Sequence, residues 1–139
     1  MVRPVAAGVM PLVVPQLRTI TVGGAVTGLG IEASSFRNGL PHESVRSMDI
    51  LIGTGEIVTA APTGPHADLF RTFPNSYGSL GYALRLRIEL EPVTPYMTLR
   101  HVPCGDATAL ADKALMIAQM EERDNSPMMI QPNIGPYTR

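Results

Sequence analysis

The sequence lacks several features by which common classes of protein are recognised. Its 139 residues contain one cysteine, Cys104, which excludes an internal disulfide and a multi-cysteine metal site. The eleven Lys and Arg residues form no run and the net charge is −1, so no nucleic-acid-binding surface is predicted. No apolar run reaches the roughly 18 residues of a membrane span. Pro4, Pro11 and Pro15 interrupt the first apolar stretch, which is a poor signal peptide. A cytoplasmic protein without metal is therefore expected.

What the sequence contains is typical of one folded domain. Hydrophobic residues make up 45% of the chain and charged residues 17%, which indicates a modest apolar core. Met48, Ile50 and Ile52 alternate with their neighbours, and this period of two predicts a strand near 45–52. Glycine, threonine and glycine at 53–55 provide a turn, and the following residues predict a returning strand near 56–61. These segments together predict a β-hairpin.

The longest strand is expected at 82–91. Its apolar residues alternate with charged ones and are Leu84, Leu86, Ile88 and Leu90. This alternation predicts one buried face and one solvated face whose charges pair across strands. Helices are expected near 24–31, 66–73 and 107–122, and the proline-rich tail at 124–139 predicts no regular structure. The predicted fold is α+β, a mostly antiparallel sheet flanked by short helices.

The segment "TVGGAVTGLGIEASSFRNG" at 21–39 is rich in small residues, with glycine at 23, 24, 28, 30 and 39. A Rossmann fingerprint requires G-x-G-x-x-G, and these glycines have a different spacing. A P-loop requires a lysine after its glycines, and none follows here. Two interpretations remain open on the residues alone. The segment packs closely against other protein, or its backbone cradles a phosphate or a flavin edge.

Longer stretches resemble a known family. "TITVGGAVTGLGIEASSFRNGLPHESVRSMDILIGTGEIVTAAP" and "DLFRTFPNSYGSLGYALRLRIELEPV" are similar to the second half of the flavin-binding domain of the vanillyl-alcohol-oxidase/p-cresol-methylhydroxylase family. Within that family they most resemble the delta(24)-sterol reductase (seladin-like) branch. The resemblance implies that residues 1–95 are the C-terminal lobe of a PCMH-type FAD-binding domain. Residues 96–139 would then begin the cap over the substrate or form an unstructured tail.

The same resemblance implies an FAD-dependent oxidoreductase whose flavin transfers hydride, with a sterol-like or other lipophilic substrate. Small residues in the glycine-rich segment would then leave room for FAD. The residues placed near the cofactor by the resemblance are Thr21, Val22, Gly23, Gly24, Gly28, Gly30, Ile31, Glu32, Ser34, Gly78, Gly81 and Tyr82. Close packing in a tight turn is an equally good reason for Gly78 and Gly81.

The resemblance is also incomplete. The resemblance implies an N-terminal lobe upstream of Pro4 that these residues are expected to lack, and apolar surface that this lobe covers would be exposed. His42, His66 and His101 match no position of covalent flavin attachment, so FAD is expected to bind non-covalently, and no catalytic residue is identified. A separate chain that supplies the missing lobe is one expected partner. The alternative is a truncated, catalytically inactive fragment that serves as a partner-binding domain.

Overall fold

The computed structural model describes residues 8–17, 19–93, 96 and 100–124, with side chains described as far as Met120. Contacts divide the chain into two compact units, Met1–Met97 and Thr98–Arg139. In the described part, the strands lie in the first unit and the longest helix in the second. The predicted α+β class is confirmed, with two small antiparallel sheets and short helices. The residues of the tail from 125 onward lie outside the described ones.

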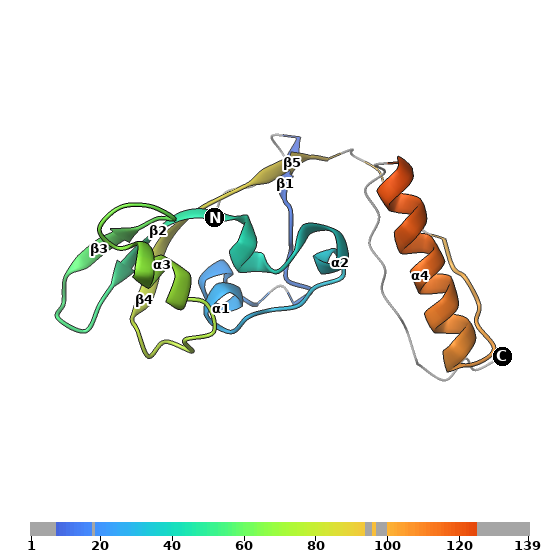
Figure 1. Cartoon of the computed structure of the whole chain (residues 1–139), viewed down its shortest axis with the longest axis horizontal. Coiled ribbons are helices and arrows are strands. Elements are labelled where there is room, and N and C mark those ends of the chain that lie inside the picture. Colours follow the sequence, from blue (N-terminus) through green and yellow to red (C-terminus); the bar gives the residue numbers. More distant parts are fainter. Residues whose placement is uncertain (1–7, 18, 94–95, 97–99, 125–139) are drawn as a thin grey trace. The chain divides into compact units, whose positions relative to one another are not determined.

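The larger sheet of the first unit is antiparallel and has three strands (Figure 1). Its strands are β2 (Val45–Leu51), β3 (Ile57–Ala60) and β4 (Tyr82–Ile88), in the spatial order β3-β2-β4. The predicted hairpin of β2 and β3 is confirmed, and its turn includes Gly55 with a φ of 86°. Glycine adopts a positive φ without steric cost, which is why the chain reverses here.

Strand β4 departs from the predicted uninterrupted alternation. Asp49 of β2 is opposite Arg85, but Ile50 is opposite Ala83, so Leu84 is the extra residue of a β-bulge. The bulge turns Leu84 outward, where 55% of it is exposed, and Ala83 packs against the core in its place. The prediction that Leu84 belongs to the buried face is therefore wrong, because a bulge shifts the period of two by one residue.

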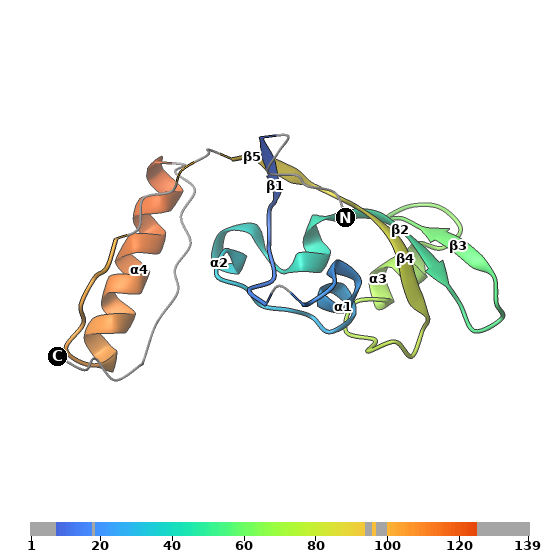
Figure 2. The same ribbon diagram turned by 180° about the vertical axis from the view of Figure 1, so that it is seen from behind.

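The predicted strand at 82–91 is also divided between two sheets. After β4 ends at Ile88, the N–H of Glu89 donates to the carbonyl oxygen of Ser44 at 2.8 Å. The chain then enters β5 (Leu90–Pro92), which pairs with β1 (Val9–Pro11) as a separate two-stranded sheet. Both views of the chain show β1 and β5 side by side, away from the hairpin of β2 and β3 (Figures 1 and 2).

The apolar core lies between one face of the three-stranded sheet and the helices α1 (Val22–Thr27) and α3 (Ala67–Thr72). Its buried side chains are Val26, Val45, Met48, Ile50, Ala60 and Phe73. Because Val26 lies on α1 and Phe73 directly follows α3, both helices pack on the same face. Burial of one such large side chain stabilises the fold by about 1.5–3 kcal/mol. The helix predicted at 66–73 is confirmed.

Charges on the outer face pair across strands, as predicted. Arg85 of β4 lies 3.8 Å from the Asp49 carboxylate of β2, and Asp49 also accepts a hydrogen bond from Thr59 of β3 at 2.8 Å. Arg46 forms an ion pair with Glu89. Pairs exposed to solvent contribute little stability, about 0–1 kcal/mol each. They make the outer face a solvated surface.

Helix α4 (Ala107–Asp124) belongs to the second unit and confirms the helix predicted at 107–122. Leu110, Ala114 and Ile117 of the predicted apolar face are half-buried. Met120, predicted on the same face, is instead 53% exposed. Two further short helices precede the central sheet, namely α2 (Ser35–Asn38) and a 3-10 helix at Pro41–Ser44.

Candidate functional site: two glycine-lined grooves

The glycine-rich segment begins with a capped helical turn. Thr21 has an extended backbone, and its Oγ1 accepts a hydrogen bond from the N–H of Gly24 at 3.0 Å. Such a cap stabilises a helix by about 1 kcal/mol. The helix ends at Gly28, whose N–H donates to the carbonyl oxygen of Gly24 at 2.9 Å. Helix α1 therefore covers residues 22–27, and the boundaries predicted at 24–31 are wrong because the capping role of Thr21 was missed.

An open groove with a volume of about 460 Å³ lies against α1, and we call it groove 1. It is lined by Thr19, Ile20, Thr21, Gly24, Ala25, Gly28, Gly30 and Glu32. The members predicted from the resemblance to approach FAD are Thr21, Gly24, Gly28, Gly30 and Glu32. Glu32 is the one charged side chain among these described lining residues. The structure thus brings residues at both ends of α1 to one concave surface.

Three lining residues of groove 1 were missed from the sequence, namely Thr19, Ile20 and Ala25. Thr19 and Ile20 directly precede the Thr21 cap, so they lie next to the start of α1. The cap at Thr21 was the signal that would have placed Thr19 and Ile20 there.

The other predicted residues of this segment do not line groove 1. A Cβ added at Gly23 would lie 3.6 Å from Cβ of Ala83, so this glycine faces β4. Ser34 is buried, and its Oγ donates to the carbonyl oxygen of Leu12 at 3.1 Å, which is a structural role. Val22 is 41% and Ile31 78% exposed. A side chain at position 23 would therefore point toward the protein and not into groove 1.

Glu32 fixes the chain that leads into groove 1. Its half-buried carboxylate lines the groove, and Oε2 accepts a hydrogen bond from the N–H of Gln16 at 2.9 Å. Its own N–H donates to Oγ of Ser35 at 2.9 Å. A hydrogen bond to a charged group is stronger than one between neutral groups, by about twofold. The carboxylate of Glu32 therefore holds the backbone of Gln16 beside groove 1.

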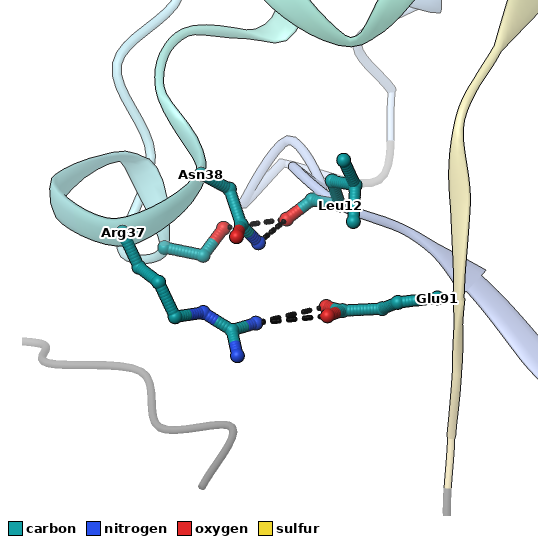
Figure 3. Close-up of polar contacts among 5 residues, drawn as sticks. Leu12, Arg37, Asn38 and Glu91 are labelled. Carbon is teal, nitrogen blue, oxygen red and sulfur yellow. Dashed lines mark hydrogen bonds and ion pairs between the residues drawn. The ribbon is translucent and has the colours of Figure 1, made fainter. Parts of the chain in front are cut away.

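A second polar cluster lies around α2 (Figure 3). Nδ2 of Asn38 donates to the carbonyl oxygen of Leu12 at 2.6 Å. Nη2 of Arg37 lies 3.0 Å from each carboxylate oxygen of Glu91 on β5, and these side chains are only 23% and 18% exposed. Helix α2 is therefore joined to β5 and to the segment after β1 by polar contacts from side chains.

A second open groove of about 260 Å³, which we call groove 2, lies at the start of β4. It is lined by Leu51, Ile52, Gly53, Gly55, Gly78, Ser79, Gly81 and Tyr82. The predicted residues Gly78, Gly81 and Tyr82 are thus brought together, but in a groove distinct from groove 1. The hairpin residues were missed from the sequence, because only the register of β4 against β2 places Leu51 opposite Tyr82.

Gly81 is required by the fold itself. A Cβ added there would lie 2.3 Å from the carbonyl oxygen of Leu51, and the φ of Gly81 is 135°. Real Cβ atoms do not approach a backbone oxygen so closely, and side chains disfavour this backbone region. Gly78 also has a positive φ, of 83°. The tight turn that the sequence offered as the alternative explanation is therefore present at both glycines.

One apolar side chain that lines groove 1 is exposed to solvent, namely Ile20, at 40%. The neighbouring segments of the chain also carry exposed apolar side chains, since Leu17 is 62% and Phe36 45% exposed.

The described residues contain no group of three or more His, Cys, Asp or Glu side chains arranged to hold a metal ion. Among the helices in the described part of the chain, none is long and apolar enough to cross a bilayer. Of the three histidines, His42 and His66 are half-buried and His101 is exposed.

No family model matches the chain. A delta(24)-sterol reductase of Arabidopsis thaliana is 40% identical over 100 residues, which cover 71% of this chain and 18% of the relative. The delta(24)-sterol reductase of Homo sapiens is 33% identical over 110 residues, or 79% of this chain and 21% of the relative. Decaprenylphosphoryl-beta-D-ribose oxidase of Mycolicibacterium smegmatis is 36% identical over 104 residues, or 74% and 22%. The chain thus spans about a fifth of the length of these relatives.

The chain is therefore homologous to a segment of the FAD-binding PCMH-type oxidoreductases. Within that class, the delta(24)-sterol reductases of plants and mammals are 33–40% identical to it. The family resemblance predicted from the sequence is confirmed.

Proposed function

We propose that this chain binds FAD non-covalently as one lobe, residues 1–95, of an FAD-dependent oxidoreductase, and that groove 1 holds part of the cofactor. The observation that carries the proposal is that Thr21, Gly24, Gly28, Gly30 and Glu32 line a single groove, in a chain that is 40% identical over 100 residues to a delta(24)-sterol reductase. The volume of groove 1, about 460 Å³, is within the usual range for sites that bind small molecules, about 300–1,000 Å³.

The residues of groove 1 fit a flat or extended nucleotide. Gly24 lines the groove without a side chain, so a ligand can approach the backbone of α1. A Cβ added at Gly24 would meet only Oγ1 of Thr21, at 3.1 Å, and one added at Gly28 would meet the carbonyl oxygen of Gly24 at 3.0 Å. FAD would supply the hydride-transfer chemistry, and this lobe would position the cofactor.

Groove 1 is open, so it covers FAD from one side only. We propose that the remaining contacts come from protein outside these 139 residues, on a separate chain or on a longer form of this polypeptide. The exposed Ile20, which lines groove 1, supports this, because contact with a second lobe would remove its apolar surface from water. Residues 96–139 would then begin the cap over the substrate. A sterol-like or other lipophilic substrate is proposed on the homology to sterol reductases.

The proposal is tested by titrating the purified chain with FAD and following the flavin fluorescence. The parent chain is expected to bind saturably. Gly24→Val should weaken binding at least about tenfold, which corresponds to 1.4 kcal/mol, because its methyl groups enter groove 1. Gly105→Val is the matched control, since a Cβ there has no neighbour within 4 Å and the residue lies in the other compact unit.

Circular dichroism of each variant separates loss of binding from loss of folding. A folded parent chain that shows no saturable binding, alone or mixed with a chain carrying the complementary lobe, would contradict the proposal. Equal binding by the parent chain and by Gly24→Val would place the cofactor elsewhere than in groove 1.

A further inference from the structure

We propose that the carboxylate of Glu32 accepts hydrogen bonds from sugar hydroxyls of the flavin nucleotide and keeps its phosphates away from this end of groove 1. This inference rests on the proposed function and deepens it, because it assigns a direction to the bound nucleotide. The ligand group expected beside Glu32 is a set of sugar hydroxyls, which FAD carries both on its ribityl chain and on its ribose.

The position of Glu32 is held by the protein. Oε2 accepts the N–H of Gln16 at 2.9 Å, and the backbone of Glu32 exchanges hydrogen bonds with Ser35, whose N–H donates to the Glu32 carbonyl oxygen at 2.9 Å. The carboxylate is therefore oriented before a ligand arrives. A pre-positioned acceptor loses less side-chain entropy when it binds a ligand than a mobile one does.

The charge and the acceptor oxygens of the Glu32 carboxylate determine which ligand groups can bind beside it. An ionised carboxylate is an acceptor at both oxygens, so a neighbouring group must donate. A phosphate carries negative charge and no donor, and among the described residues that line groove 1 no cation offsets the repulsion. The N–H of the flavin ring and the amino group of adenine are flanked by acceptors, which would face the same carboxylate. Hydroxyls on a flexible sugar chain can rotate to donate without this conflict.

Thr21 and Glu32 both line groove 1, and the chain between them forms α1 and the residues that follow it. Thr21 caps the start of this helix, whereas Glu32 follows its end by five residues. Glu32 is the one charged side chain among the described residues that line groove 1, so its carboxylate dominates the charge of this surface.

Glu32→Gln tests the inference, because the amide oxygen can still accept the N–H of Gln16 while the negative charge is lost. The variant is expected to bind FAD about five- to tenfold more weakly than the parent chain, since a charge-assisted hydrogen bond becomes a neutral one. The same loss is expected for one of the two fragments of FAD, either riboflavin or ADP. Weaker riboflavin binding assigns the ribityl chain, and weaker ADP binding assigns the ribose. Lumiflavin, which has no sugar chain, should bind equally to both proteins. Glu56→Gln in the exposed hairpin turn is the matched control.

Three outcomes distinguish the possibilities. Tighter FAD binding by Glu32→Gln would show that phosphate lies near Glu32 and would overturn the inference, while the proposed function stands. An equal loss for lumiflavin and riboflavin would show a structural role for Glu32 only, and would overturn it as well. Absence of FAD binding by the folded parent chain would instead overturn the proposed function.

Discussion

Gly24 in groove 1 and Gly81 in groove 2 lack side chains for different physical reasons. At Gly81 an added Cβ would lie 2.3 Å from the carbonyl oxygen of Leu51, so the protein itself occupies the space. At Gly24 the nearest atom is the hydroxyl of Thr21, at 3.1 Å, and the groove beyond is open. A glycine against backbone is explained by packing. Gly24 lines an open surface, where the lack of a side chain lets a ligand approach the backbone of α1.

The two grooves also differ in the contacts that hold their residues in place. Groove 2 is fixed by main-chain pairing, because β2 and β4 place Leu51 opposite Tyr82. In groove 1 a side chain makes such a contact, because the carboxylate of Glu32 accepts the N–H of Gln16. Substitutions of polar side chains should therefore affect groove 1. Groove 2 should instead be affected by substitutions of glycines such as Gly81, where the backbone conformation excludes a side chain.

The largest effect on stability is expected from Gly81→Ala. The clash with the Leu51 carbonyl and the φ of 135° should lower the free energy of unfolding by about 3 kcal/mol or more. Urea unfolding measures the change. Gly53→Ala in the same groove is the matched control, because a Cβ there meets nothing within 4 Å, and it should change stability by less than about 0.5 kcal/mol. Equal effects of the two variants would contradict a packing origin for Gly81.

An intermediate effect is expected from Arg37→Ala. The substitution leaves the Glu91 carboxylate, only 18% exposed, without its ion-pair partner, and should lower the free energy of unfolding by about 1–3 kcal/mol. Arg71→Ala breaks the exposed pair with Asp68 and serves as a control, with an expected change below about 0.5 kcal/mol. If both variants unfold at the same urea concentration, the Arg37–Glu91 pair does not stabilise the fold more than an exposed pair does.

The smallest effect, and one of opposite sign, is expected from Gly23→Ala. The added Cβ would make an ordinary contact with Ala83 at 3.6 Å, and alanine favours a helix over glycine by about 0.5–1 kcal/mol. Thermal and urea unfolding should show a small stabilisation. Destabilisation would mean that α1 and β4 lie closer together than the structure shows.

The sequence by itself determined the local elements and the family. Alternation of apolar residues predicted β2, the glycines at 53 and 55 predicted its hairpin, and the cluster of apolar residues before Pro74 predicted α3. These signals are local, because each depends on the conformational preferences of a few consecutive residues. The order of several motifs likewise sufficed to indicate the homology to FAD-binding oxidoreductases.

Tertiary structure alone decided what depends on contacts between distant residues. The bulge at Leu84, the passage of the chain from β4 into a second sheet, and the approach of Gly81 to Leu51 follow from pairing with strands far away in the sequence. The same holds for the pair of Arg37 with Glu91 and for the division of the predicted site between two grooves. Local preferences do not encode these contacts, because they form only when packing and main-chain hydrogen bonding bring separate segments together.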